Sequence, residues 1–359
     1  MKILAFFFKK PVRLSEDYFP TVDIVIAAYN EEKLIEGAVR SIYEDSYPHE
    51  LLKVWVGDDG SSDRTAEILT LLQKEFPSLT VINLPRTGKN GVLNELFKRI
   101  SGEITVFMDA DCLIIDKSLH RLVAPFQNST VGASIGRLKF QRNNSNAGTQ
   151  GESFYHRLEH FMRSQESEIF SIVSSLGAFY AVKKEYILPL PNDSVCDDYL
   201  PLLRVAQRRK RILYSPSAHI VEIREKDTSY EFGRIIRFTS GGLAALREIK
   251  SLLLPHYGWV SFFLWSHKIL RWISPFFLCL LFIASAIAAF KSPFIMILFS
   301  VQAAFYTLAF LGWLAERNGR ESSVLKLCYF FFVMNISMMI GIYQFLQNTS
   351  TDSWEPSNR

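Results

Sequence analysis

Residues 103–111 read Glu-Ile-Thr-Val-Phe-Met-Asp-Ala-Asp, an apolar run that ends in two carboxylates. The run has the length and composition of a buried strand, so we expect Asp109 and Asp111 to lie where that strand ends. Two carboxylates at positions i and i+2 of a turning backbone can meet one hard divalent cation. Mg²⁺ commonly takes one or two carboxylates and completes its shell with phosphate oxygens and water. An Asp-x-Asp pair alone is also compatible with a plain acidic turn.

The segments before this strand alternate between strand-like and helix-like patterns. We expect strands at 21–28, 52–56 and 79–83 and helices at 31–43, 64–75 and 90–100, with Asp63 as the N-cap of the second helix. This alternation predicts an α/β fold with a mostly parallel sheet, flanking helices and right-handed crossovers.

Polar clusters follow the expected strands at 29–31, 58–59, 86–89 and 109–111. Ligands bind beyond the carboxyl ends of the strands in such sheets, so we expect a nucleotide site at that edge. The dinucleotide fingerprint G-x-G-x-x-G is absent, and residues 88–90 lack the glycine spacing of a P-loop. A dehydrogenase or a P-loop enzyme is therefore not favoured.

Taken together, the motifs resemble those of the family 2 glycosyltransferases over residues 20–345. The layout is similar to the catalytic subunits of bacterial synthases of poly-N-acetylglucosamine, cellulose and hyaluronan. The resemblance implies a GT-A nucleotide-sugar-binding domain and a hexosyl- or N-acetylhexosaminyltransferase activity. The matching residues are Ala27–Glu32, Val56–Asp63, Arg86–Lys89 with Leu93 and Asn94, Asp109–Asp111, Ser175–Tyr180, Asp197–Leu202, Arg234–Phe238 with Gly241 and Gly242, Ser266–Lys268, and Arg271 with Trp272.

The resemblance also implies roles on the donor side. Asp59 would accept a hydrogen bond from the base, expected to be the uracil of a UDP-sugar. The implied cofactor is Mg²⁺ or Mn²⁺, bound by Asp111 and by Asp109, which would touch either the ribose or the metal. Tyr29, Asn30 and Glu31 are expected to line the base and ribose, and Lys89 to lie near the nucleotide or its diphosphate. Asn94 is also expected to bind substrate.

Asp198 resembles the catalytic base of the family. Such a base takes a proton from an acceptor hydroxyl as that hydroxyl attacks the anomeric carbon, and partial burial that raises its pKa helps. A single displacement would invert the anomeric centre, so an α-linked donor would give a β-linked product. Asp197 is the competing candidate, with a helix N-cap as its plainer interpretation.

Arg234 and Arg237 are three residues apart on an expected helix and so share a face. The family motif is Q-x-x-R-W or R-x-x-R-W, and here the sequence reads R-x-x-R-F. Phe238 keeps an aromatic platform for a sugar but lacks the indole N–H donor, which weakens the case for a processive polymer synthase. The two guanidinium groups would clamp a diphosphate. The alternative is that they face lipid headgroups.

The C-terminal part differs sharply in composition from the rest. Residues 256–359 hold 7 Lys/Arg and 4 Asp/Glu, and three charge-free runs lie at 273–290, 294–315 and 327–347. As helices these would span roughly 27 to 33 Å, close to a bilayer core of about 30 Å. Basic residues near 268–271 and 317–326 predict a cytoplasmic head, with the single Lys291 as a minor contradiction.

These patterns divide the chain into an N-terminal membrane-proximal segment (1–20), a GT-A domain (21–227), interfacial or gating helices (228–272), three transmembrane helices (273–347) and a tail (348–359). We expect residues 252–266 to lie on the membrane surface. The expected location is a bacterial inner membrane. The net charge of +4 argues against a nucleic-acid partner. An oligomer or a membrane partner subunit is left open.

The sequence therefore predicts a metal-dependent inverting glycosyltransferase that uses a nucleotide-sugar donor and a lipid or polysaccharide acceptor. Polysaccharide synthesis is the first version, and addition of one sugar to a lipid or lipid-linked acceptor is the second. A catalytically silent membrane scaffold is the alternative from another class, and the intact set of aspartates argues against it.

Overall fold

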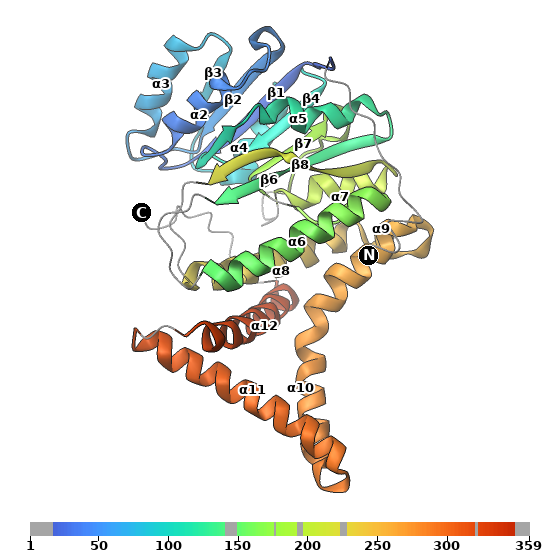
Figure 1. Cartoon of the computed structure of the whole chain (residues 1–359). Helices are drawn as coiled ribbons and strands as arrows, with labels where there is room; N and C mark the ends of the chain where they lie inside the picture. Colours follow the sequence, from blue (N-terminus) through green and yellow to red (C-terminus); the bar gives the residue numbers. More distant parts are fainter. Residues whose placement is uncertain are drawn as a thin grey trace.

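The computed structural model describes residues 17–140, 149–175, 177–191, 197–222, 228–319 and 322–348. The side chains of 140, 149–156 and 228–231 lie outside this description, as do residues 1–16 of the expected membrane-proximal segment and all but the first residue of the expected tail. Figure 1 shows a head built on a sheet and a stem of helices below it.

An eight-stranded sheet forms the centre of the head, in the order β3-β2-β1-β4-β7-β6-β8-β5. The half of the sheet from β3 to β4 is parallel, as predicted, whereas β7 runs antiparallel to both β4 and β6, and β5 antiparallel to β8. The strands are β1 (Val22–Ala28), β2 (Leu52–Asp58), β3 (Leu79–Asn83), β4 (Ile104–Met108), β5 (Cys112–Ile115), β6 (Val131–Phe140), β7 (Phe179–Lys183) and β8 (Arg211–Glu222).

Helices cover both faces of this sheet and divide the core in two. One apolar cluster lies under α2, α3 and α5, and the other lies under α4 and α7 and continues into α8 and the stem. The head and the stem therefore share the second of these two clusters. The helices of the head are α2 (Ile35–Glu44), α3 (Thr65–Glu75), α4 (Lys89–Phe97), α5 (Ser118–Val123), α6 (Thr149–Ile169) and α7 (Tyr199–Gln207), with 3₁₀ turns at His49–Leu51, Ala124–Gln127 and Lys184–Tyr186.

Two local expectations differ from the structure. Residues 31–34 form a turn, so the first helix starts at Ile35 and not at 31. Arg64 occupies the N-cap position of α3. Asp63, one residue earlier, still serves this end of the helix, because its carboxylate accepts hydrogen bonds from the backbone N–H of Thr65 at 3.0 Å and of Glu32 at 3.1 Å.

The stem begins with α8 (Thr228–Glu248) and short turns at Lys250–Leu253 and Pro255–Tyr257. A continuous helical stretch follows, made of α9 (Trp259–Phe263), a π-helical turn (Leu264–Ile269), α10 (Leu270–Ala288) and a last turn (Ala289–Lys291). The remaining helices are α11 (Pro293–Arg317) and α12 (Ser323–Gln347). Within the described residues, three helices are long and apolar enough to cross a membrane, and the first of them starts at Trp259, well before 273.

Pro275 lies inside α10 and removes the N–H that would bond to the carbonyl of Arg271. The hydroxyl of Ser274 donates a hydrogen bond to that carbonyl at 2.8 Å. A side chain one residue away thus replaces the missing backbone donor, which is how a proline is tolerated in an apolar surrounding.

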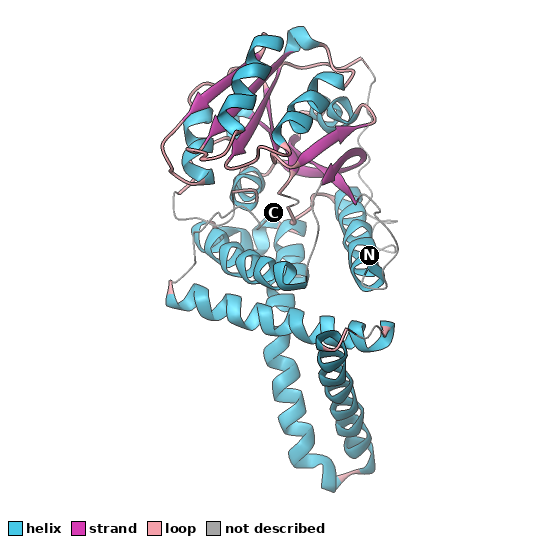
Figure 2. Cartoon of the chain, turned by 90° about the vertical axis from the view of Figure 1, so that its left-hand side faces the viewer, coloured by secondary structure: helices cyan, strands magenta, loops and turns pink. Residues whose placement is uncertain are grey.

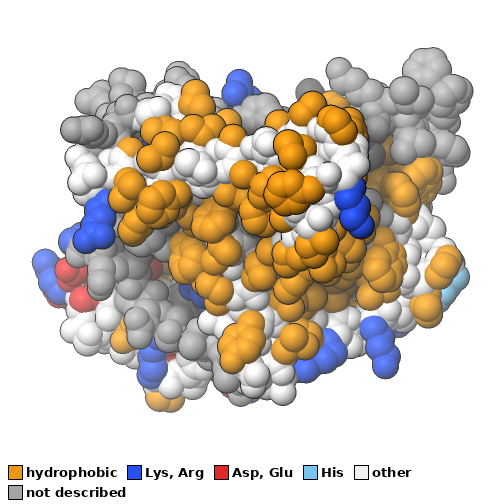
Figure 3. Space-filling model, turned by 90° about the horizontal axis from the view of Figure 1, so that it is seen from below, with side chains coloured by type: hydrophobic (Ala, Val, Ile, Leu, Met, Phe, Trp, Pro, Cys, Tyr) orange, Lys and Arg blue, Asp and Glu red, His pale blue; other side chains and the backbone are white. Residues whose placement is uncertain are grey.

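The three stem helices do not run as a parallel bundle. Figures 1 and 2 show that α10 and α11 form a V with the turn at Lys291 at its tip, while α12 lies across beneath α8. The contact between α12 and α8 is close, because a Cβ added to Gly341 would lie 2.7 Å from the Cβ of Thr239 and 2.8 Å from the carbonyl oxygen of Ile236. From below, hydrophobic side chains cover much of the surface and Lys and Arg side chains lie at its rim (Figure 3).

Candidate functional site

Asp59 connects the loops after β2 and β3. Its carboxylate is fully buried and accepts hydrogen bonds from the backbone N–H of Thr87 at 2.6 Å and of Gly88 at 3.0 Å, from the Thr87 hydroxyl at 3.1 Å, and from the guanidinium of Arg86. The Arg86 guanidinium in turn stacks on the ring of Tyr29, 3.5 Å from its centroid. An ionised carboxylate has about four acceptor sites, and these four donors already occupy them. A nucleobase that binds Asp59 therefore has to share a site with one of the donors or displace it.

Asn30 and Glu31 link the loop after β1 to the loop after β2. Asn30 has a left-handed backbone (φ 53°), and its side-chain oxygen accepts a hydrogen bond from the N–H of Ser62 at 2.8 Å. The N–H of Glu31 donates to the hydroxyl of Thr65 at 2.8 Å. These contacts bring the predicted base-lining residues to one edge of the sheet, and their contact with a ligand stays a prediction.

Lys89 is the cation at the centre of the site. It begins α4 directly after Gly88, whose φ of 80° is a conformation that favours glycine. Its ammonium lies 2.8 Å from Asp109 and 2.7 Å from Asp197. Burial would lower the pKa of Lys89, but the attraction of the two carboxylates outweighs burial and holds that pKa well above its usual value. Lys89 therefore joins the end of β4 to the segment that precedes α7.

The carboxylates here fit a divalent cation when a substrate completes its shell. Asp109 and Asp111 follow β4, and Asp111 is buried with the thiol of Cys112 3.5 Å from its Oδ1. Among the residues that the structure describes, no three His, Cys, Asp or Glu side chains converge as a metal centre. The carboxylates of Asp109 and Asp111 are hard oxygen ligands, and the negative charge of the site exceeds the positive charge of Lys89. Both features suit Mg²⁺ or Mn²⁺, provided that phosphate oxygens supply the other ligands.

Asp198 has the properties expected of a general base. It occupies the N-cap position of α7, yet its carboxylate makes no capping hydrogen bond. The side chain is buried and hydrogen-bonded to Ser175, and in the described part of the chain Oδ2 has no hydrogen-bond partner. Burial first, and then the charge of Asp197, raise the pKa of Asp198 to about 6. This carboxylate can be ionised at neutral pH and still hold a transferred proton.

Asp197 differs from Asp198 in both exposure and partners. Its carboxylate is paired with Lys89 and its backbone carbonyl accepts a hydrogen bond from Tyr180 at 3.1 Å. The geometry therefore favours Asp198 over Asp197 as the base. The N-cap interpretation, which the sequence suggested for Asp197, applies by position to Asp198.

The predicted R-x-x-R-F segment lies on α8, beside the helix that begins after Asp198. A Cβ added to Gly242 would lie 4.0 Å from the ring of Tyr199, which marks the crossing of α8 and α7. At 1.5 Å per residue, Arg237 and Arg234 lie roughly 8 and 12 Å further along α8. Arg234 stacks on Phe238, 5.6 Å from its ring centroid, and the Phe238 side chain is exposed. Their contact with substrate stays a prediction.

Asn94 has a scaffold role in the structure. Its amide nitrogen donates to the carbonyl of Leu190 at 2.8 Å, and its amide oxygen accepts from the N–H of the same residue at 2.7 Å. These two bonds hold the segment after β7 against α4. Both polar atoms of the side chain are therefore engaged, and the substrate-binding role predicted for Asn94 stays untested.

Several residues that complete the site could not be assigned a role from the sequence. Arg86 was part of a motif but received no role, although it contacts both Asp59 and Tyr29. Ser175 was also quoted only as part of a motif. Arg163 and Glu166 of α6 lie in none of the motifs, and His267, which bonds Glu166, is 101 positions away in the sequence.

Comparisons with known proteins agree with this fold. The fold and the site define a GT-A domain joined to apolar helices. A solved structure of the mannosyltransferase PcManGT from Pyrobaculum calidifontis, in complex with GDP-Man and Mn²⁺, has the same fold, with a TM-score of 0.73 and 23% identity over 97% of this chain and 93% of that chain. Residues 23–184 match the model of glycosyl transferase family 2, so the chain carries a domain of that family.

The curated relatives include synthases of a glycolipid and of a polysaccharide. The chain is 32% identical to a beta-monoglucosyldiacylglycerol synthase of Trichormus variabilis over 169 residues, which are 46% of this chain and 36% of the relative. It is 22% identical to a poly-beta-1,6-N-acetyl-D-glucosamine synthase of Staphylococcus aureus over 227 residues, 60% of this chain and 55% of the relative. The predicted resemblance to the family 2 glycosyltransferases is confirmed for the domain at residues 23–184. The chain spans about a third of the length of the glycolipid synthases that it matches.

Proposed function

We propose that this chain transfers a sugar from a nucleotide-sugar donor to a membrane-associated hydroxyl acceptor, with Asp198 as the general base. The observation that carries this proposal is the buried Oδ2 of Asp198, which has no hydrogen-bond partner in the described part of the chain. The charged group of Lys89, Asp109 and Asp197 lies in the same site, at the edge of the sheet where such folds bind ligands.

The reaction follows from these positions. The acceptor hydroxyl donates its proton to Oδ2 of Asp198 while its oxygen bonds to the anomeric carbon, and the bond from that carbon to the diphosphate breaks. The nucleoside diphosphate leaves with the electron pair, and the Lys89 ammonium stabilises the growing negative charge. A Mg²⁺ or Mn²⁺ ion held by Asp109 and Asp111 would supply further charge stabilisation when bound. One displacement inverts the anomeric centre.

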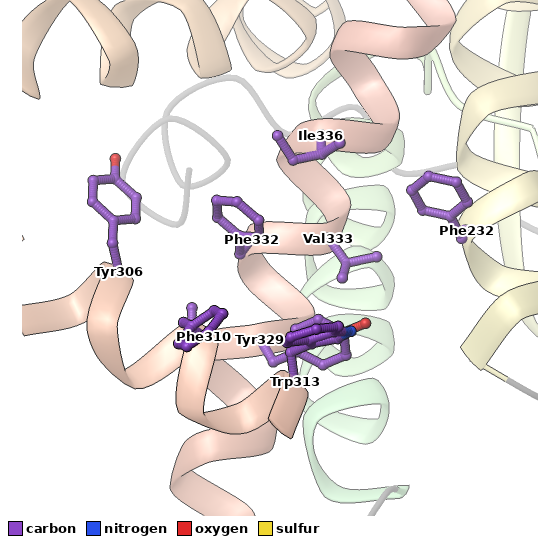
Figure 4. A pocket seen from close by; sticks show the side chains of 9 residues that line it. Phe232, Tyr306, Phe310, Trp313, Tyr329, Phe332, Val333 and Ile336 are labelled. Carbon is purple, nitrogen blue, oxygen red and sulfur yellow. The ribbon is translucent and has the colours of Figure 1, made fainter. Parts of the chain in front are cut away.

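Of the two versions of this function, we favour the transfer of one sugar to a lipid acceptor. A groove of 330 Å³ lies where α8, α11 and α12 meet, and six of its nine lining side chains are aromatic. Figure 4 shows them along the two stem helices, with Phe232 reaching across from α8. A volume above about 300 Å³ is typical of a ligand pocket, and an apolar groove on membrane helices suits one hydrocarbon chain. The relatives with the higher identity are also named as glycolipid synthases.

Polysaccharide assembly, the first version from the sequence, is the second candidate. The paired Arg234 and Arg237 on α8 and the similarity to a poly-beta-1,6-N-acetyl-D-glucosamine synthase support it. The three apolar helices of this chain form an open V and a crossing helix, which would be a thin wall for a polymer channel (Figure 1).

The stem supports a location in the bacterial inner membrane with the head on the cytoplasmic side. Lys268 and Arg271 lie where α10 begins, and Arg317 and Lys326 flank the turn between α11 and α12. The tip of the V carries only Lys291, which is the distribution expected when the tip is translocated.

The test is a donor and acceptor screen with the purified full chain in lipid vesicles. Labelled UDP- and GDP-sugars are supplied with Mn²⁺ and with diacylglycerol or an oligosaccharide, and products are identified by mass. One sugar added to lipid supports the favoured version, whereas a ladder supports polymer assembly. Turnover unaffected by EDTA would exclude the metal, and no transfer from any donor would leave the silent scaffold as the better account.

A further inference from the structure

A line of charged side chains connects α6 to the stem. Glu159, Arg163 and Glu166 lie four and three residues apart and so share one face of α6. On the stem side, His267 Nδ1 is hydrogen-bonded to Glu166, and Arg271 lies 3.5 Å from Glu159. Only 7% of the Arg163 side chain and 4% of the Glu166 side chain are exposed. Buried charges are retained only when they are paired, so each of these contacts matters for the others.

The same α6 residues hold a segment that leads to the active site. Arg163 donates from Nε to the Ser174 hydroxyl at 3.1 Å and from its terminal nitrogen to the carbonyl of Ser175 at 3.0 Å. The N–H of Val173 donates to Glu166 at 3.1 Å. Three hydrogen bonds with two side chains of α6 therefore hold residues 173–175, two at the backbone and one at the Ser174 hydroxyl.

This segment passes directly beside Asp198. The Ser175 side chain hydrogen-bonds the Asp198 carboxylate. Two residues later Gly177 has a φ of 53°, and a Cβ added there would lie 3.3 Å from Oδ2 of Asp198. The segment 173–175 thus holds one side of the carboxylate and leaves Oδ2 for the acceptor.

We propose that Arg163 and Glu166 are positioning residues for Asp198, and that His267 of the stem orients Glu166. They act through residues 173–175, which set the hydrogen bond from Ser175 and hence the direction of the carboxylate. This inference rests on the proposed function, because it assigns a task to the general base. In a purely structural account these charges only attach α6 to the stem. Replacing them would then lower the stability of the protein, and the effect on kcat would not depend on Ser175.

The experiment is a double-mutant cycle with Arg163→Met and Ser175→Ala in the full chain. A misplacement of about 1 Å can lower a rate by about 10²-fold, so each single variant should lower kcat by about 10- to 100-fold with an unchanged donor KM. Because both changes break the same hydrogen-bonded path, the double variant should be no slower than the slower single variant. Arg163→Lys keeps one donor and the charge, and should recover part of the rate.

Arg211→Met is the matched control. Arg211 is also buried and donates to the carbonyls of Phe170 at 2.6 Å and Ser167 at 3.0 Å, so it holds the end of α6 through these two residues. Arg211→Met should lower the thermal midpoint as much as Arg163→Met does. In the double variant with Ser175→Ala, the two fold-losses in kcat should multiply, because the two changes act independently. Multiplying effects for Arg163→Met and Ser175→Ala in an active enzyme would overturn the inference and leave the proposed function standing. A wild type without transferase activity would overturn both.

Discussion

Replacement of Asp198 by Asn probes the proposed base most cleanly. The side chain is buried at the start of α7, and Asn has nearly the same shape, so the fold should persist. The amide can still accept the hydrogen bond from Ser175, but it cannot take a proton from the acceptor. Any loss of rate should therefore appear in kcat, with little change in the KM of the donor.

The magnitude follows from the pKa of the carboxyl group. A general base contributes about 10²–10⁴-fold, and we expect a loss in that range at pH 7.5. Burial and Asp197 raise the pKa of Asp198 to about 6, and the base works only when it is deprotonated. The wild-type rate should therefore fall as the pH drops through 6, and at pH 5 it should be about tenfold below its plateau.

The assay is the initial rate of transfer from pH 4.5 to pH 8.5. Asp198→Asn should show a low residual rate that does not fall further as the pH drops through 6; this fall is the acid limb of the wild-type profile. Asp197→Asn serves as the control, because removal of its charge should lower the pKa of Asp198 and move the limb below pH 6. A variant at position 198 that keeps the limb, or that keeps more than half of the wild-type rate, would refute the role of Asp198.

Three further predictions concern the site and the stem. Lys89→Met removes the cation that lies 2.8 Å from Asp109, and kcat/KM for the donor should fall about 10²–10³-fold in steady-state assays. Gly341→Leu places a side chain against Thr239 and should lower the free energy of unfolding by about 1–3 kcal/mol in thermal denaturation. Gly233→Ala, inside α8 with open space around it, should raise that free energy by about 0.5–1 kcal/mol. Ala309→Trp fills the groove of Figure 4 and should raise the KM of a lipid acceptor about tenfold, equal to 1.4 kcal/mol of binding free energy, without changing the donor KM. An unchanged acceptor KM would show that the hydrocarbon chain binds elsewhere.

The parallel half of the sheet was predictable because its signals are local. Each strand from β1 to β4 is an apolar run, and each ends in polar residues such as Asp109. The antiparallel β7 was not foreseen, since its place between β4 and β6 depends on pairing with residues that are distant in sequence. Local patterns report which residues form a strand and say little about its partners.

The same limit applies to the site. Asp198 could be proposed from its motif, but its advantage over Asp197 depends on Lys89, more than 100 positions earlier in the chain. The bond between Glu166 and His267 joins residues 101 positions apart, and no spacing rule connects them. The three apolar runs were visible in the sequence, whereas the crossing of α12 beneath α8 follows from the close fit at Gly341.

The anomeric configuration of the product tests the central claim most directly. The purified chain is given an α-linked nucleotide sugar labelled at the anomeric carbon, and the coupling at that carbon is measured by NMR in the isolated product. Direct displacement assisted by Asp198 predicts a β-linked product whose formation is lost in Asp198→Asn. An α-linked product, or the same β-linked product at an undiminished rate in that variant, would contradict the account.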